Sequence, residues 1–547
     1  MSQSRELTSD PPDFVWWKHG VVYQVYPRSF QDSNGDGIGD LEGVIQRLDY
    51  LEALGIHALW LSPVYCSPMD DFGYDVRDHV SIDPLFGDMP TFRRLTHEIH
   101  ARGLRLILDY IPNHTSDQHV WFQESRSSRA NPRRDWFIWR DPSADGAPPN
   151  NWRSEFGGPA WSWDDTTGQY YYHAFLASQP DLNWRNPDVV EAMLNVLRFW
   201  LDHGVDGFRV DAIHHLIERE HLADNPANPF WHEGMDPAEQ LVQSHTVDQP
   251  EVHTAVAAMR RVLDGYEGER VLIGEAYLPI DRLVTYYGGA GDGFHLPFNF
   301  HLITTPWTPT AIASLILAYE AKLPAGGWPN WVLGNHDRSR LASRLGGPQA
   351  RVAAMLLLTL RGTPTLYQGD ELGMKDVEIP PHRVQDPWEL NVPGLGLGRD
   401  PVRTPMLWSD APHAGFSTVE PWLPLSNDWR EIHVDRQSAL PNSLLALYRA
   451  LLALRRQEEA LWRGDYVPIA ATDTLLVYER RVKSERLLVV LNLSGRSAAV
   501  TTPPGTIIAN YRPHWDQPAG RWRVGDLAQR RVDHPLALST RQTTRCS

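Results

Sequence analysis

Short apolar runs rich in Val, Ile, Leu and aromatic residues recur along the chain as far as residue 369, and longer amphipathic stretches separate several of them. The short runs predict strands, whereas the stretches at 91–103, 187–204 and 348–362 repeat apolar residues at helical spacing. Strands that alternate with helices pair in parallel, and eight of them predict a closed (β/α)8 TIM barrel. The eight runs span residues 20–30, 57–65, 104–112, 205–212, 270–277, 293–300, 331–337 and 363–369.

The alternation is interrupted twice. Residues 113–179 are rich in Trp, Asp, Pro and Gly and are too numerous for a connecting loop, so we expect an inserted domain after strand three. Residues from about 371 to 428 are irregular again and predict a second insertion, after strand eight. We therefore expect one barrel domain built from 14–112 and 180–462, with a long helix at 442–456 near its end.

The last part of the chain follows a different pattern. Segments 474–481 and 486–494 show the alternation of antiparallel strands. Residues 463–547 are therefore predicted to form a small C-terminal antiparallel β domain.

The composition narrows the possible partners and the location. A chain of 547 residues with 42% apolar residues and 22 Trp is long enough for two or three well-buried domains. Its net charge of −17 repels nucleic acids and anionic membranes. The first twenty residues contain no apolar segment typical of a signal peptide, and only Cys66 and Cys546 are present, so we expect a cytoplasmic protein.

Polar residues cluster where the predicted strands end, which is the active face of a (β/α)8 barrel. A single acid at such a position often only caps the next helix. Several acids and histidines that converge on one rim indicate a functional site, because adjacent carboxylates repel one another and would otherwise be unfavourable. The residues concerned are Asp109, Asn113, His114, Arg209, Asp211, Glu275, His336 and Asp337.

Glycoside hydrolysis is a reaction that suits this set. It requires one carboxylate as nucleophile and one carboxylic acid as proton donor, about 5–5.5 Å apart when configuration is retained. Asp211 and Glu275 follow neighbouring predicted strands, and we expect Arg209 to keep Asp211 ionised. Glu275 lies in an apolar context that favours its protonated form. The residue types alone do not decide which carboxylate has which role.

Four motifs resemble the signature regions of the α-amylase family of glycoside hydrolases. They are "DYIPNHTS", "GFRVDA", "GEA" and "NHD", and they occur in this order after strands three, four, five and seven. The segments "QPDLNW" at 179–184 and "GRDPVRTPMLW" at 398–408 are similar to the oligo-1,6-glucosidase and α-glucosidase branch of that family.

This resemblance implies a role for each matching residue. Asp211 would be the nucleophile that forms a covalent glucosyl-enzyme, Glu275 the acid/base, and Asp337 the carboxylate that stabilises the transition state. The residues implied to bind substrate are Asp75, His114, Arg209, His336 and Arg403, of which Asp75 and Arg403 would close the pocket around the non-reducing end of the sugar.

The loop "DSNGDGIGDLEG" at 32–43 departs from a calcium sensor, because an EF-hand requires Glu at its twelfth position and this loop has Gly43. The resemblance implies that it holds one structural divalent cation, Ca²⁺ or alternatively Mg²⁺. Alternating acids around glycines supply the hard oxygen ligands that such ions prefer. A metal-free cluster of Asx turns is the alternative. The implied ligands are Asp32, Asn34, Asp36, the carbonyl of Ile38, and Asp40.

The preferred linkage depends on a single residue. Within the resembled branch, Val directly after the nucleophile accompanies α-1,6 specificity, and Ala212 here favours α-1,4 linkages. We expect a retaining α-glucosidase that also transfers glucose to sugar or alcohol acceptors, as a monomer or homodimer. An oligo-1,6-glucosidase or a sucrose- or trehalose-directed isomerase or transglucosidase is the alternative. A non-catalytic barrel, as in amino-acid-transporter heavy chains, is opposed by the intact set of three acids.

Overall fold

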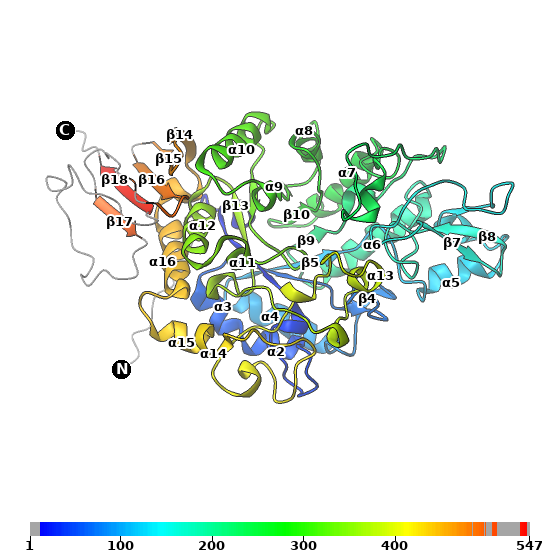
Figure 1. Ribbon diagram of the computed structural model, residues 1–547, viewed down its shortest axis with the longest axis horizontal. Helices are drawn as coiled ribbons and strands as arrows, with labels where there is room; N and C mark the ends of the chain where they lie inside the picture. Colours follow the sequence, from blue (N-terminus) through cyan, green and yellow to red (C-terminus); the bar gives the residue numbers. More distant parts are fainter. Residues whose placement is uncertain (1–10, 484, 497, 499–505, 511–536, 544–547) are drawn as a thin grey trace.

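The computed structural model describes residues 11–483, 485–496, 498, 506–510 and 537–543. Eight strands pair in parallel in the order β11-β10-β9-β5-β2-β1-β13-β12, and a bridge between Asn299 and Trp331 joins the two outer strands (Figure 1). The predicted (β/α)8 barrel is therefore confirmed. Its strands are β1 (Val22–Val25), β2 (Ala58–Leu61), β5 (Arg105–Tyr110), β9 (Gly207–Val210), β10 (Val271–Gly274), β11 (Leu296–Pro297), β12 (Asn330–Val332) and β13 (Thr363–Tyr367).

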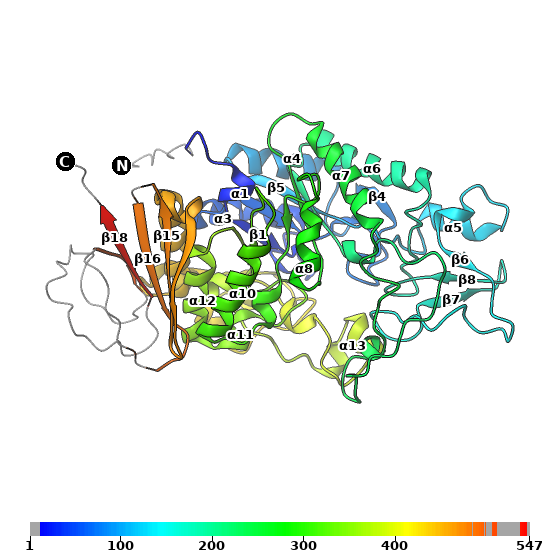
Figure 2. The same ribbon diagram turned by 90° about the horizontal axis from the view of Figure 1, so that it is seen from above.

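Helices that connect the strands surround the barrel (Figures 1 and 2). The sequence sets the bounds of α6 locally: Asn186 caps its first turn, Pro187 occupies the first helical position, and Gly204 follows its end with φ of 90°. The longer helices are α4 (Met89–Ala101), α6 (Pro187–Asp202), α7 (Val252–Asp264), α10 (Pro309–Lys322), α12 (Gly347–Thr359) and α16 (Leu444–Gln457), and the first strand is followed by the short helices α2 (Leu41–Gln46) and α3 (Leu48–Leu54).

Alternate residues of the strands point into the barrel. Ile107 and Ile273 belong to the apolar cluster that fills the interior. Because side chains alternate along a strand, Asp109 and Glu275, two residues further on, face the same interior at its carboxyl end. Arg209 lies opposite Asp109 on one neighbouring strand and opposite Ile273 on the other. The alternation of side chains along each strand therefore brings Asp109, Arg209 and Glu275 together inside the barrel.

Two further units flank the barrel at its opposite ends (Figure 2). The inserted domain after β5 contains α5 (Val120–Ser127) and a three-stranded antiparallel sheet of β6 (Trp139–Arg140), β8 (Gln169–Tyr172) and β7 (Trp161–Asp164). The C-terminal sheet is antiparallel in the order β14-β15-β16-β18-β17. Its strands are β14 (Asp465–Ala471), β15 (Leu475–Val482), β16 (Glu485–Asn492), β17 (Thr506–Asn510) and β18 (Ala537–Thr543). Both predicted additions to the barrel are confirmed; part of the predicted segment 463–547 lies outside the described residues.

The insertion after β13 is irregular, as predicted, and contains the short helix α13 (Pro387–Asn391). Figures 1 and 2 show α13 on the side of the barrel where the inserted domain lies. The two insertions therefore meet over the same end of the barrel. Within the part of the chain that the structure describes, no helix has both the length and the apolar character needed to cross a membrane.

Candidate active site

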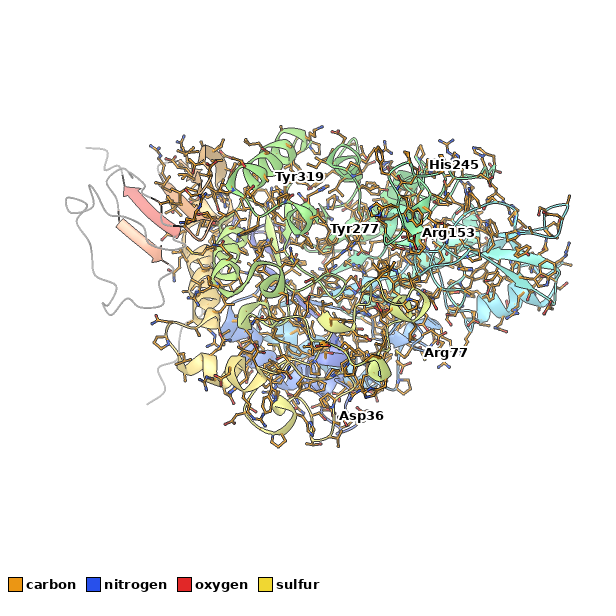
Figure 3. All side chains as sticks on the ribbon, in the orientation of Figure 1. Asp36, Arg77, Arg153, His245, Tyr277 and Tyr319 are labelled. Carbon is orange, nitrogen blue, oxygen red and sulfur yellow. The ribbon has the colours of Figure 1, made fainter. Side chains whose placement is uncertain are left out.

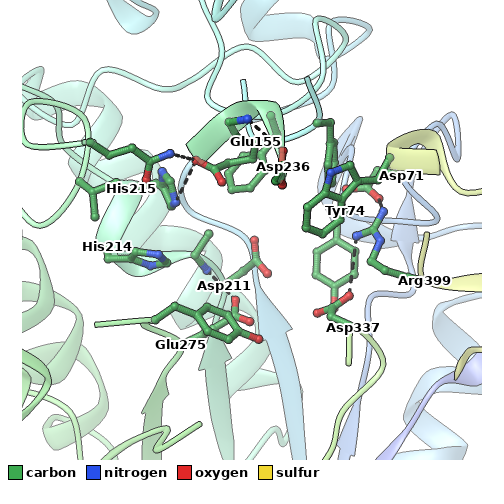
Figure 4. A pocket seen from close by; sticks show the side chains of 18 of the residues that line it. Asp71, Tyr74, Glu155, Asp211, His214, His215, Asp236, Glu275, Asp337 and Arg399 are labelled. Atoms are coloured by element: carbon green, nitrogen blue, oxygen red, sulfur yellow. Dashed lines mark hydrogen bonds and ion pairs between the residues drawn. The ribbon is translucent and has the colours of Figure 1, made fainter. Parts of the chain in front are cut away.

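The carboxyl ends of the barrel strands open into a cavity of about 480 Å³ (Figure 4). Asp211, Glu275 and Asp337, which follow β9, β10 and β12, line it. The inserted domain and residues 228–247 supply other parts of its wall. The structure therefore brings together, in one cavity, the three acids that the sequence singled out.

Arg209 organises two of these acids from behind the cavity. Its Nη1 lies 2.7 Å from Asp211 Oδ1 and 2.6 Å from Asp109 Oδ1, and its Nη2 lies 2.6 Å from Glu275 Oε2. The side chain of Arg209 is only 1% exposed. In addition, the backbone N–H of Ala212 donates a hydrogen bond to Glu275 Oε2 over 3.0 Å, from a left-handed conformation with φ of 44°. Arg209 contacts protein carboxylates and serves to position them.

The shared guanidinium changes the expected electrostatics of Asp211. Burial raises the pKa of Asp211 well above its ordinary value, and the charges of Glu275, Asp109 and Asp337 add to this rise, so that Arg209 lowers it only in part. The predicted ion pair between Arg209 and Asp211 is present and lowers the pKa of Asp211, and its ionised state stays a prediction. One positive charge is divided among three carboxylates, so Arg209 offsets only part of the rise that burial and the neighbouring acids cause in the pKa of Asp211.

Asp337 lies in a contrasting environment. Burial would raise its pKa, but the contact with the adjacent His336 ring and the positive charges of Arg403 and Arg399 together outweigh burial and hold the pKa well below the ordinary value. Burial also lowers the pKa of His336, so this imidazole is neutral at neutral pH and the two arginines carry the positive charge. Arg403 Nη2 lies 2.7 Å from Asp337 Oδ1, and Arg399 Nη1 lies 3.7 Å from the same oxygen. Asp337 is therefore ionised.

The two predicted histidines both line the cavity. His336 Nε2 contacts the Tyr74 hydroxyl at 2.6 Å, and its Nδ1 contacts Gln24 Nε2 at 2.8 Å. His114 Nε2 contacts the Tyr74 carbonyl at 3.1 Å, and burial lowers its pKa to about 3. Both rings are neutral, so each presents one donor and one acceptor nitrogen.

The structure corrects the pair that was expected to close the pocket. The Asp75 carboxylate accepts hydrogen bonds from Ser67 Oγ at 2.8 Å, Asp70 N at 2.8 Å and Asp71 N at 3.0 Å, and so stabilises its own loop. Among the described residues, Asp75 and Arg403 do not line the cavity. Arg403 is fully buried and donates to the His336 carbonyl and to Asp337.

The residues four positions earlier in each segment occupy the expected place. Asp71 and Arg399 line the cavity and form an ion pair of 2.7 Å (Figure 4). Arg399 also pairs with Asp386 at 2.8 Å, which fixes its guanidinium. Spacing alone could not select the correct member of either pair, because both segments are irregular. Sequence reasoning also missed Tyr74, Glu155 and His215, which line the same cavity.

The loop at 32–43 lies at the periphery: Figure 3 shows Asp36 at the edge of the molecule, away from Tyr277, which lines the cavity. Asp32 Oδ1 accepts hydrogen bonds from Asn34 N and Gly35 N, and Asp40 Oδ1 accepts one of 2.7 Å from Gly43 N. Its donor set is made only of oxygens and suits Ca²⁺. Among the described residues, no group of three His, Cys, Asp or Glu side chains could hold a metal ion as placed. The metal stays a prediction.

Comparisons with known proteins agree with this geometry. Residues 24–464 match the family model described as alpha amylase, catalytic domain. The chain is 40% identical to the probable alpha-glucosidase of Rhizobium meliloti over 507 residues, which cover 90% of this chain and 92% of that protein. It is 39% identical to the oligo-1,6-glucosidase of Halalkalibacterium halodurans over 542 residues, covering 91% of this chain and 95% of that protein.

A solved structure of the alpha-glucosyl transfer enzyme XgtA is similar with a TM-score of 0.88 and 40% identity, over 96% of this chain and 99% of that chain. Both the sequence motifs and the fold thus lead to the same group of proteins. The chain belongs to the α-amylase family of glycoside hydrolases.

Proposed function

We propose that this protein is a retaining α-glucosidase in which Asp211 is the nucleophile and Glu275 the acid/base. The observation that carries the proposal is the pair of carboxylates held by the two terminal nitrogens of Arg209, in a cavity whose other side is occupied by the Asp71–Arg399 ion pair. A retaining glycosidase requires two carboxyl groups close together, without room for a water molecule between them and the sugar.

The proposed reaction proceeds in two displacements. Asp211 attacks the anomeric carbon and forms a glucosyl ester, while Glu275 gives its proton to the departing glycosidic oxygen. Glu275 then takes a proton from water or from an acceptor hydroxyl, whose oxygen attacks the anomeric carbon and releases Asp211. The first step consumes one proton, which Glu275 has to carry when the substrate binds. Ionised Asp337 stabilises the positive charge that develops on the sugar ring.

The substrate is proposed to be a short α-glucoside. A sugar bound against Asp71 and Arg399 meets a closed end of the cavity, so the enzyme would release single glucose units from non-reducing ends and act poorly on long polymers. Ala212, which lines the cavity beside Glu275, leaves space that we propose favours a 4-linked sugar. Sugar or alcohol acceptors would receive glucose when they compete with water.

Two further properties belong to the proposal. Asp32, Asn34, Asp36, the Ile38 carbonyl and Asp40 would hold a structural Ca²⁺. The ion would stabilise the contact between this loop and the insertion after β13, where Ser417 Oγ donates to Asp32 Oδ2 over 2.6 Å. A cytoplasmic location, as a monomer or homodimer, remains the prediction.

Early products from maltose, isomaltose, sucrose, trehalose and soluble starch test the function. We expect glucose released first as the α-anomer, maltose as the best of the five substrates, and slow release of single glucose units from starch. Preference for isomaltose would support the oligo-1,6-glucosidase alternative, and rearranged sucrose would support the isomerase alternative. Release of the β-anomer would contradict the retaining mechanism.

A further inference from the structure

The cavity has a second end that the proposed catalytic steps do not use. Figure 4 shows Asp71 and Arg399 on one side of the cavity and Glu155 and His215 on the other. Because the proposed glucose site lies at the Asp71–Arg399 side, the group beyond the cleaved bond has to occupy the opposite side. We name this opposite side the aglycone end and define it by Glu155, His215, Asp236, Glu239 and Gln243, all of which line the cavity.

Glu155 is held at the aglycone end with one carboxyl oxygen available. Gln243 Nε2 donates a hydrogen bond to Glu155 Oε1, and His215 Nε2 lies 4.0 Å from the same oxygen. Among the described residues no hydrogen bond engages Oε2. The side chain remains 27% exposed, and Glu155 lines the cavity, so this oxygen is accessible to a ligand. A polar atom in such a place gains from a hydrogen-bonding partner.

His215 provides a second, independent indication of a ligand. The residue is only 6% exposed, and its Nδ1 has no hydrogen-bond partner among the described residues. Its ring lies 5.3 Å from that of Phe175, which also lines the cavity. Burial lowers the pKa of His215 well below its ordinary value, so the ring is neutral. A neutral ring can donate from one nitrogen and accept at the other, as hydroxyl groups require.

The ionisable side chains that define the aglycone end are mostly acidic, while Arg153, whose charge acts on Asp236, and Arg338, which also lines the cavity, lie outside this set. Glu155, Asp236 and Glu239 are acidic, and none of the five residues that define this end is Lys or Arg. Burial, with the charges of Asp236 and Glu239, raises the pKa of Glu155 to about 7, while the Gln243 hydrogen bond opposes the rise. An anionic group placed here would be repelled, whereas a neutral hydroxyl finds both donors and acceptors.

We infer that Glu155, with Gln243 and His215, binds the hydroxyl groups of the aglycone and selects neutral aglycones over anionic ones. The inference rests on the proposed α-glucosidase function and adds a specificity-determining residue to it. Glu155 comes from the inserted domain, and Gln243 from the segment between β9 and α7. The inserted domain and the segment between β9 and α7 therefore share the recognition of one sugar.

The test compares three substrates at pH 8, where Glu155 is mainly ionised. Maltose presents hydroxyls at the aglycone end, 4-nitrophenyl α-glucoside presents none, and 4-carboxyphenyl α-glucoside presents a negative charge. The variants are Glu155→Ala and the nearly isosteric Glu155→Gln, with Glu220→Ala as control, since Glu220 is an exposed acid of the β9–α7 segment that does not line the cavity.

We expect Glu155→Ala to lower kcat/KM for maltose about tenfold or more, and to change kcat/KM for 4-nitrophenyl α-glucoside less than about threefold. Glu155→Gln should raise the ratio of carboxyphenyl to nitrophenyl cleavage about fivefold or more, because it removes the repelling charge. Glu220→Ala should match the wild type.

Equal losses on maltose and the nitrophenyl glucoside, or an unchanged ratio in Glu155→Gln, would overturn the inference while the wild-type activity leaves the proposed function intact. A wild-type enzyme that cleaves none of the three substrates would overturn both. The ratio is measured within one variant, so a partly unfolded variant still gives a valid answer.

Discussion

Asp71 and Asp75 lie four positions apart in the sequence, and their contacts give them different roles. Asp71 faces the cavity and pairs with Arg399, whereas Asp75 accepts three hydrogen bonds from its own loop. The substitutions Asp71→Asn and Asp75→Asn keep the size of each side chain and remove its charge. They therefore form a matched pair that separates substrate binding from loop stability.

The expected magnitudes follow from the contacts. Asp71→Asn should lower kcat/KM by about 10- to 150-fold, because a hydrogen bond to a charged group contributes roughly 1.5–3 kcal/mol. Its stability should change by only about 1 kcal/mol, since Arg399 keeps its 2.8 Å ion pair with Asp386. Asp75→Asn loses the bond from Asp70 N to Oδ2 and places an amide donor against that N–H. Its free energy of unfolding should fall by about 1–3 kcal/mol, with kcat/KM within about fivefold of wild type.

Two measurements decide between these tasks. Steady-state kinetics on maltose at 25 °C gives kcat/KM, and urea unfolding of the same samples gives the stability. The reasoning is refuted if Asp75→Asn is the variant that loses activity at wild-type stability, because Asp75 would then contact the sugar directly.

Three other outcomes are expected. Chelation should lower the melting temperature without altering the initial rate on maltose, because metal bound only to the folded state stabilises by about 2.7 kcal/mol at a hundred times Kd; a curve indifferent to chelator, with no metal by elemental analysis, would count against the site. Ala212→Val should reduce the preference for maltose over isomaltose by up to about a hundredfold, and no change in this ratio would exclude Ala212 as the determinant. Burial raises the pKa of Asp370 to about 7 in the folded protein, whereas in the unfolded chain this pKa is about 4. The proton bound by folded Asp370 therefore contributes its full stability below about pH 4, and this contribution is lost as pH rises to 7. Asp370→Asn should therefore remove a decline in unfolding free energy on the order of 4 kcal/mol between pH 4 and 7, and a decline equal to that of wild type would contradict this.

Strand periodicity accounts for what the sequence predicted correctly. The inward-facing positions of β5, β9 and β10 continue past the strand ends, so Asp109, Arg209, Asp211 and Glu275 had to meet at one face of the barrel. The architecture of the barrel with its insertions followed from the same patterns.

Irregular segments account for the features that the sequence did not predict. The loop that holds Asp71 and Asp75 and the turn that holds Arg399 and Arg403 have no fixed period, so four-residue spacing did not reveal which side chain faces the cavity. Glu155 belongs to an insertion whose position over the barrel depends on tertiary contacts. The sharing of Arg209 among three carboxylates likewise depends on distances that a motif does not contain.

In the C-terminal sheet, the alternation predicted the strands now seen as β15 and β16. It did not reveal β14, whose residues are mostly exposed and lack a buried face that alternates. A strand of this kind is defined by its neighbour, not by its own pattern.

The central claim is that Asp211 forms a covalent bond to glucose. The most direct measurement is mass spectrometry of peptides from Glu275→Gln after reaction with 5-fluoro-α-glucosyl fluoride, whose good leaving group does not need an acid and whose adduct is released slowly. The account predicts one added fluoroglucosyl group on the peptide that contains Asp211, and none in the double variant with Asp211→Asn. An adduct on Asp337 or Asp109, or an adduct that persists when Asp211 is replaced, would contradict it.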